Sequence, residues 1–200
     1  PDDVVKEYGA DTLRLYEMFV GDFEKAAPWS TSSIRGCKRF LDRIWALQDN
    51  LIDGDTYRES LVRKMHQTIQ KVSNDIETLK FNTAIAAMME LLNEITATGS
   101  INKAEFRTLL ILLNPFAPHI TEELYETYCG GILHEQSWPT YDEALCKEDT
   151  IEIVVQINGK VRCKMNIAVG AEKDAVLEQA LAEPKIAEAV AGKQLVKQIY

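Results

Sequence analysis

The sequence predicts a mainly α-helical fold, an antiparallel helix bundle, followed by a small α+β domain. Apolar residues recur at spacings of three and four through most of the first 148 residues, which is the period of an amphipathic helix. Asn158-Gly159 lies between two short apolar runs, an arrangement typical of a β-hairpin. The charge balance also changes: residues 1–150 carry 15 Lys and Arg against 25 Asp and Glu, whereas residues 151–200 carry 7 against 6. The sequence therefore predicts a domain boundary near 148–150.

The first residues favour a helix that continues an earlier part of a protein. Pro1 suits the first turn of a helix because its missing N–H costs nothing there, and Asp2 and Asp3 suit the positive end of the helix dipole. The chain has no initiator Met, no signal-peptide pattern and no apolar run near the roughly 20 residues that a membrane span needs. We therefore expect residues 1–27 to be a connector that enters a fold already under way.

The helix predicted from Ile34 to Leu47 has the most distinctive surface. Its apolar positions share one face and are Cys37, Phe40, Leu41, Ile44 and Trp45. The opposite face carries four cations, which are Arg35, Lys38, Arg39 and Arg43, offset locally only by Asp42. Because the net charge of −9 disfavours nonspecific nucleic-acid binding, an RNA contact must use a local basic face such as this one. The alternative is an ordinary solvated helix face.

Three more helices complete the predicted bundle, over residues 57–79, 81–95 and 103–113, with Asn102 as the cap of the last one. Pro118 can begin a further helix, because proline is well tolerated in the first turn. The lengths of these segments suit an antiparallel bundle with short connections.

Nothing in the sequence predicts a catalytic or metal site. His119 has no nucleophile or paired acid near it in sequence, so we expect a structural histidine at a helix start. Phe116 and Trp138 are expected to pack the last helix and its loop, and no histidines have zinc-ligand spacing. The four cysteines lie far apart without a Cys-x-x-Cys pair, which favours reduced thiols over a disulfide framework. We expect no catalytic residue, no metal and no cofactor in this chain.

The turn of the hairpin allows two registers. A two-residue turn would pair Val155 with Arg162 and so mix charge into the apolar face. A three-residue loop with glycine in the left-handed position would pair Val155 with Val161, and we prefer it because a one-residue slip moves every side chain to the other face. In that register the apolar face holds Ile151, Ile153, Val155, Val161, Cys163 and Met165. The other face holds the cations Lys160, Arg162 and Lys164, with Glu152 opposite Lys164.

This basic hairpin face suits contact with a sugar–phosphate backbone better than base reading, and the alternative is a solvated outer sheet face. Two helices, over residues 172–182 and 184–191, are predicted after the hairpin. Residues 195–200 are predicted as a third strand. Because the sequence ends inside that strand, we expect an exposed sheet edge in the small domain.

Several motifs follow one another along nearly the whole chain: YGADTLRLY (8–16), PWS (28–30), RFLDRIW (39–45), NPFAPHITEELYE (114–126), SWP (137–139) and VVQINGKVR (154–162). In this order they closely resemble the bacterial leucyl-tRNA synthetases, which are class I aminoacyl-tRNA synthetases, in the part after the catalytic domain. Neither the Lys-Met-Ser-Lys-Ser loop nor the His-Ile-Gly-His-type signature of that family occurs in the chain. The resemblance therefore implies that the catalytic and editing domains are missing.

The resemblance also implies the domain organisation and the partner. It implies a connector over residues 1–27, a tRNA-binding bundle of the anticodon-binding-domain type over 28–148, and a small C-terminal domain over 149–200 that lacks its last strand. The partner would be tRNA(Leu), held mainly through its sugar–phosphate backbone by the cations of the helix and the hairpin. ATP and magnesium would belong to the absent catalytic domain, which activates leucine and attaches it to tRNA. A cytoplasmic monomer without membrane contact is implied.

Cys163 departs from the family pattern, in which glycine usually follows the basic residue of the hairpin. RNA contact there would be weaker or shifted if it needed that glycine, and we prefer a core position for the cysteine. Two other hypotheses stay open: the same region of a valyl-, isoleucyl- or methionyl-tRNA synthetase, or a helical protein-interaction module with merely solvated basic faces. Against the former, the chain lacks the cysteine cluster of many isoleucyl tails and the charged coiled coil of valyl ones.

Overall fold

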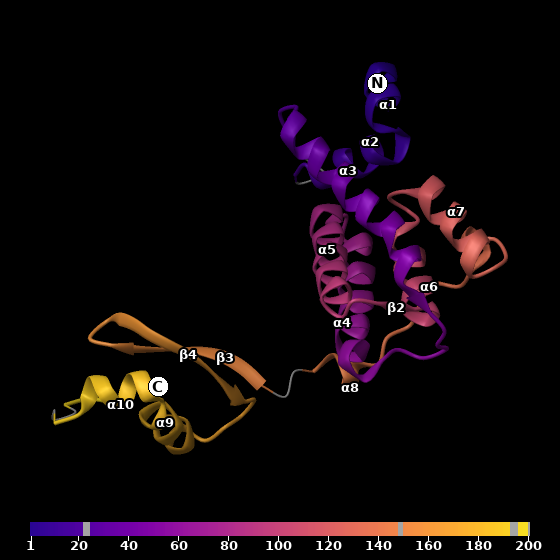
Figure 1. Ribbon diagram of the computed structural model, residues 1–200. Helices are drawn as coiled ribbons and strands as arrows, with labels where there is room; N and C mark the ends of the chain where they lie inside the picture. The colour runs from indigo at the N-terminus through magenta and orange to yellow at the C-terminus, as the bar shows by residue number, and fades with distance from the viewer. Residues whose placement is uncertain (22–24, 148–149, 193–195, 200) are drawn as a thin grey trace. The chain divides into compact units, whose positions relative to one another are not determined.

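The structure, a computed structural model, describes residues 1–21, 25–147, 150–192 and 196–199. It divides into two compact units, Pro1–Cys146 and Lys147–Tyr200. The first unit is a set of packed helices, and the second is a β-hairpin with two helices (Figure 1). The prediction of a mainly α-helical fold followed by a small α+β part is confirmed.

Eight α-helices are described in the first unit: α1 (Asp2–Tyr8), α2 (Ala10–Phe19), α3 (Thr31–Ala46), α4 (Glu59–Glu77), α5 (Phe81–Ala97), α6 (Lys103–Leu113), α7 (Pro118–Tyr128) and α8 (Glu143–Cys146). Short 3-10 helices cover Leu47–Asn50 and Leu133–Glu135. The helices α4 and α5 lie side by side and run in opposite directions (Figure 1). A parallel pairing of two-residue strands, β1 (Leu51–Ile52) with β2 (Ile101–Asn102), joins the segments before α4 and α6 and was not predicted.

A single hydrophobic core holds this unit together. Leu15, Ile34, Met65, Met88 and Phe106 come from five different helices and are each fully buried. Burial of one such side chain contributes roughly 1.5–3 kcal/mol. The core therefore fixes the rotation of each helix about its axis, and with it the direction in which the opposite face points.

The prediction that Trp45 belongs to the buried face of α3 is wrong. Its side chain is 45% exposed, whereas the neighbouring Ile44 is fully buried. Position 45 is turned by about 100° from position 44 on an α-helix, so the two cannot both point to the centre of the core. The buried arc of α3 is narrower than the apolar pattern suggested.

Helix α6 begins with the cap that the sequence predicted. The Asn102 side chain accepts from the Glu105 N–H at 2.9 Å, and the Glu105 carboxylate accepts from the Asn102 N–H at 3.0 Å, which completes a capping box. The same carboxylate is fully buried and pairs with the Arg58 guanidinium, with Oε2 at 2.7 Å from Nη2. This long-range pair anchors the start of α4 to the start of α6.

The loop regions around α7 pack largely as expected. Pro118 begins the helix, and Phe116 is buried at the preceding turn. Trp138 is 39% exposed, yet its indole N–H donates to the Ser73 hydroxyl at 2.8 Å and so holds the following loop against α4.

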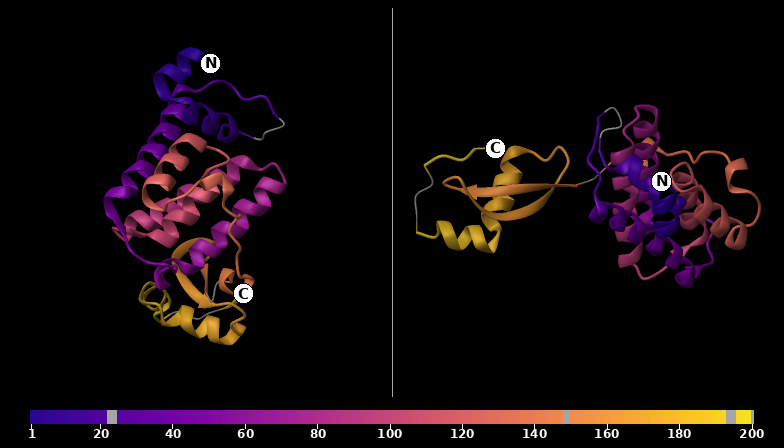
Figure 2. Two further views of the ribbon diagram at one scale, coloured as in Figure 1. Left: turned by 90° about the vertical axis from the view of Figure 1, so that its right-hand side faces the viewer. Right: turned by 90° about the horizontal axis from the view of Figure 1, so that it is seen from above.

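The second unit contains β3 (Thr150–Ile157), β4 (Lys160–Ala168), α9 (Lys173–Ala182) and α10 (Pro184–Val190). The two strands are antiparallel, and α9 packs against the hairpin (Figures 1 and 2). Its main cluster of buried side chains is small and consists of Met165, Ile167, Val176 and Ala180.

The preferred three-residue hairpin loop is wrong. Ile157 pairs with Lys160 across a two-residue Asn158-Gly159 turn, and a β-bulge next to Val155 then shifts the register, so that Val155 pairs with Cys163. Arg162 is the extra residue of β4 at this bulge. The bulge combines the tight turn with an apolar face, an arrangement that neither predicted register contained.

The apolar face of the hairpin differs from the prediction at its two ends. Val161 pairs with Gln156 and is 60% exposed, whereas Ile167 is buried and joins Met165. Cys163 lies on the face of Met165 and is half-buried, but it does not belong to the buried cluster of this unit. Helix α9 explains why Met165 and Ile167 are the buried residues of the hairpin, because Val176 and Ala180 pack against the end of the hairpin away from its turn.

The predicted third strand is not formed over residues 196–199, where Val196 is 95% and Ile199 is 78% exposed. Residues 195 and 200 of that prediction lie outside the described residues. Apolar alternation alone does not make a strand, because a strand also needs a partner for its backbone N–H and C=O groups.

Candidate nucleic-acid interface

The start of α3 is held in place by contacts to α2. Ser30 caps the helix, since its hydroxyl accepts from the Ser33 N–H at 3.2 Å. The Ser30 N–H in turn donates to the Tyr16 hydroxyl at 2.8 Å, and the Trp29 ring lies edge-on to the Tyr16 ring with centroids 4.9 Å apart. These contacts fix the N-terminus of α3, the helix that carries the cationic face, against α2.

The four predicted cations of α3 have different surroundings. Lys38 forms an ion pair with Asp42. Arg43 is half-buried and donates from Nη2 to Asn93 Oδ1 at 2.9 Å and to Thr96 Oγ1 at 3.3 Å, so it bridges α3 and α5. Arg35 and Arg39 are exposed and have no hydrogen bond or ion pair to any residue that the structure describes. These two guanidinium groups, one helical turn apart, are the α3 cations without a partner among the described residues.

The three hairpin cations do not share one face. Lys160 pairs with Ile157 and Lys164 pairs with Val154, and these two partners point to opposite faces of β3. Lys164 also forms an ion pair with Glu152 at 2.7 Å, so the predicted opposition of these two residues exists as a diagonal contact. Arg162 is exposed at the bulge, and neither it nor Lys160 has an ion pair among the described residues. The predicted basic face of the hairpin is therefore not formed, because Lys160 and Lys164 lie on opposite faces.

A second structural arrangement joins α2 to the start of α7. One Asp11 oxygen accepts from the Ile120 N–H at 2.7 Å, and the other lies 2.7 Å from His119 Nδ1. Asp11 thus supplies the cap that Ala117, at the N-cap position, does not. Arg14 donates to the Pro115 carbonyl at 3.1 Å and braces the same junction. His119 lies at a helix start, as predicted, and its contacts are structural.

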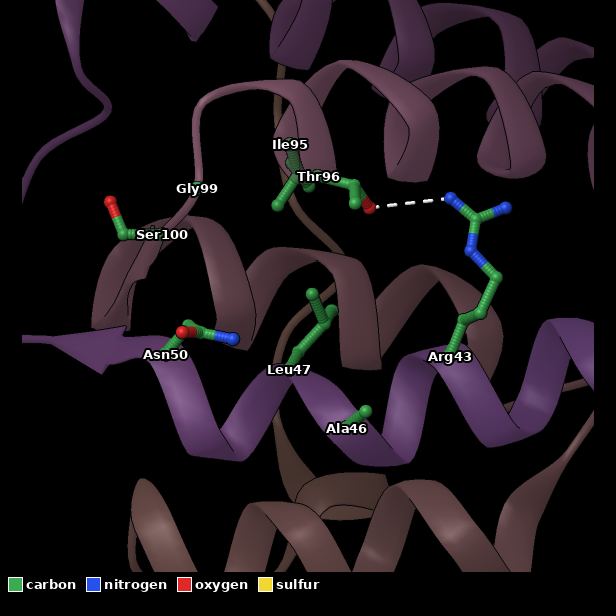
Figure 3. Close-up of a pocket in the computed structure, with 8 residues that line it drawn as sticks. All are labelled: Arg43, Ala46, Leu47, Asn50, Ile95, Thr96, Gly99 and Ser100. Carbon is green, nitrogen blue, oxygen red and sulfur yellow. Dashed lines mark hydrogen bonds between the residues drawn. The ribbon is translucent and has the colours of Figure 1, made fainter.

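Sequence reasoning missed a pocket between α3 and α5, which we call the α3–α5 pocket. It has a volume of about 170 Å³, and its lining includes Arg43, Ala46, Leu47, Asn50, Thr96 and Ser100. Figure 3 shows Arg43 at one end and Asn50 at the other, with Ala46 and Leu47 on one side and Ile95 and Thr96 on the other. In the sequence, only the polar residues near the C-terminal ends of α3 and α5 could have indicated this pocket.

The three cysteines of the first unit, all among the described residues, have raised thiol pKa values. Burial raises the pKa of the Cys37 thiol to about 11, and burial also raises the thiol pKa of Cys129 and Cys146. A thiol with a raised pKa is protonated at neutral pH and is a poor nucleophile. Among the residues with described positions, no group of three or more His, Cys, Asp or Glu side chains could hold a metal ion. None of the described helices is long and apolar enough to cross a membrane.

Residues 59–177 match the family model described as the anticodon-binding domain of tRNA ligase. The chain is 51% identical to a leucine–tRNA ligase of Alkaliphilus oremlandii over 100% of its own length and 25% of that protein. It is 45% identical to a leucine–tRNA ligase of Herpetosiphon aurantiacus, again over 100% of the chain and 26% of the relative. The chain thus spans about a quarter of the length of these curated relatives.

A solved structure is similar over the whole chain as well. It is the crystal structure of a ternary complex of Agrobacterium radiobacter K84 agnB2 LeuRS with tRNA and LeuAMS, with a TM-score of 0.76 and 30% sequence identity. The match covers 100% of this chain and 29% of that one. Both α3 and the hairpin, each with its own candidate cations, lie within the matched region.

Proposed function

Because this chain belongs to the anticodon-binding-domain family of tRNA ligases, we propose that it is the tRNA-binding part of a leucine–tRNA ligase. The resemblance to leucyl-tRNA synthetases that the sequence motifs indicated is confirmed by relatives 41–51% identical over almost the whole chain. The observation that carries the proposal is this similarity over the whole chain, together with two arginines on α3 that have no partner among the described residues of an acidic molecule. The partner is tRNA(Leu), bound by a monomer of the enzyme in the cytoplasm.

The complete enzyme forms leucyl-adenylate from ATP and leucine, with magnesium, and then transfers leucine to tRNA. This chain contributes binding and no chemistry. Arg35 and Arg39 contact phosphates of the tRNA body, and Arg43 adds a third positive charge to that helix, whereas the Lys38–Asp42 ion pair adds no net charge. On the hairpin, Lys160 and Arg162 contact the sugar–phosphate backbone, and Lys164 supports them through its ion pair with Glu152.

The division of the hairpin cations refines this proposal. A contact on one face of the hairpin uses either Lys160 or Lys164 but not both, since they lie on opposite faces. Arg162 at the bulge is the member of the set with the least constrained direction, because a bulge re-aims its side chain. We therefore assign the larger share of RNA binding to α3.

The proposal is tested by comparing the binding of tRNA(Leu) with that of an unrelated RNA of equal length in a gel-shift titration. We expect preferential binding of tRNA(Leu) and a steep loss of affinity with added salt. Equal binding of the two RNAs, or none, would instead favour a helical protein-interaction module. The non-catalytic role is checked by pyrophosphate exchange into ATP with leucine, for which we expect no activity from the chain alone.

A further inference from the structure

We propose that the α3–α5 pocket is a subsite for a single nucleotide of the bound RNA, with the base inside the pocket and its phosphate at Arg43. This inference rests on the proposed tRNA binding and adds a base-recognition site to a surface otherwise suited to backbone contact. It is carried by the volume, the lining and the charge of the pocket.

The pocket has room for much more than a single water molecule. Its volume of about 170 Å³ greatly exceeds the roughly 15 Å³ that a single water needs. The lining is apolar on two opposing sides, where Leu47 and Ile95 are largely buried in the core and Ala46 is exposed (Figure 3). A base that leaves its stack loses apolar contacts, and walls of this kind replace them.

The polar groups of the pocket fit the edge of a base. The Asn50 side chain carries both a donor and an acceptor and has no hydrogen bond to any residue that the structure describes. In Figure 3 its amide nitrogen is directed toward the pocket. An asparagine amide can bind a base edge through two hydrogen bonds, a contact that distinguishes one base from another.

Arg43 is positioned for the phosphate of the same nucleotide. One terminal nitrogen is held by Asn93 and Thr96, which fixes the guanidinium plane. In Figure 3 the other terminal nitrogen points away from the other labelled residues of the pocket. It has no hydrogen-bond partner among the described residues, so it remains available as a charge-assisted donor.

The charge around the pocket suits an anionic ligand. No Asp or Glu lines it. Ser100 on its border is held by Arg58, which donates to the Ser100 hydroxyl at 3.0 Å and to its carbonyl at 2.9 Å. Gly99 has a φ of 76° and open space where a Cβ would be, so its backbone leaves the rim accessible.

The test uses the four ribonucleoside 5′-monophosphates as probes against the isotope-labelled 200-residue chain. We expect at least one of them to shift the amide resonances of residues 43–50 and 96–100 in a saturable way, and inorganic phosphate not to do so. The variant Ala46→Phe fills the pocket and should remove these shifts. The matched control Ala97→Phe replaces an exposed alanine in the last turn of α5, next to Thr96 but outside the pocket lining, and should keep them.

The same two variants are then compared in binding tRNA(Leu). Ala46→Phe should weaken binding by about tenfold, the usual scale for one base contact, without changing the salt dependence. If the unchanged chain binds no tRNA, the proposed function fails. If it binds tRNA but Ala46→Phe binds equally well, or if no monophosphate shifts the pocket resonances, only the pocket assignment is overturned.

Discussion

The two units of the chain hold their cations by different means. In the first unit, α3 lies on a core shared by several helices, and that core sets the direction of Arg35 and Arg39. In the second unit, the hairpin has a small buried cluster, and a single bulge decides which face each cation occupies. The comparison teaches that a helix face on a large core is predictable from spacing, whereas a hairpin face depends on one residue of register.

The largest effect should come from breaking the buried pair of the first unit. Glu105→Ala leaves Arg58 and two backbone N–H groups without their acceptor and should cost about 3–5 kcal/mol of unfolding free energy. Urea denaturation followed by helix content measures this loss. The matched variant Glu90→Ala removes an exposed partner of Lys64 and should cost less than about 1 kcal/mol. Equal effects would contradict a special role for the buried pair.

The next effect is confined to the second unit. Met165→Ala removes a buried side chain from its small cluster and should cost roughly 2–5 kcal/mol, comparable to the stability that a unit of this size can hold. Amide hydrogen exchange should then rise throughout β3, β4 and α9 while the exchange of α3–α6 is unchanged. The control Asn166→Ala changes an exposed side chain of the same strand. If protection in the first unit also fell, the two units would not be independent.

A smaller effect should come from the cap that α2 supplies to α7. Asp11→Ala removes the acceptor of the Ile120 N–H and should cost about 1–2 kcal/mol. Thermal unfolding of this variant, compared with that of Asp3→Ala on the exposed face of α1, isolates the cap from the loss of one charge. Identical melting temperatures for the two variants would show that the cap from Asp11 to α7 does not contribute to stability.

The smallest effect concerns pH. Burial acts to raise the pKa of Glu122, but hydrogen bonds from His134 and from the Leu133 and His134 N–H groups outweigh it and hold that pKa below its ordinary value of 4.5. A carboxyl group whose pKa is lower in the folded protein than in the unfolded chain stabilises the fold at pH values above its ordinary pKa. This stabilisation is lost as the pH falls through the lower pKa of the folded state. The stability of Glu122→Gln should therefore decline less steeply below pH 4.5 than that of the exposed control Glu123→Gln. If the stability of both variants fell equally steeply below pH 4.5, the stabilising role of the ionised Glu122 would be contradicted.

The helices and their limits were largely predictable from the sequence. The observed bounds of α6 are those expected, and its Asn102 cap was recognised from the residue type alone. Trp45 was misplaced because the apolar pattern does not reveal how wide the buried arc of a helix is. The local spacing of apolar residues thus predicts where a helix forms, but it predicts the width of the buried face less well.

The contacts between distant segments were not predictable. Glu105 and Arg58 are separated by 47 positions, and Asp11 and His119 by 108, so no local pattern connects them. The burial of Met165 and Ile167 depends on Val176 and Ala180 of α9, which lies outside the hairpin, and the bulge at Arg162 was not part of either register considered. The candidate cations could be named from the sequence, but which of them are paired depended on such tertiary neighbours.

The most direct test of the account is the salt dependence of tRNA(Leu) binding by the double variant Arg35→Ala/Arg39→Ala. If both guanidinium groups contact phosphates, affinity falls and the slope of log affinity against log salt decreases by about 2 in magnitude, or about 1 for each cation removed. Lys80→Ala, an exposed cation at the turn between α4 and α5, is the control and should leave the slope unchanged. An unchanged slope in the double variant would contradict the assignment of tRNA binding to α3.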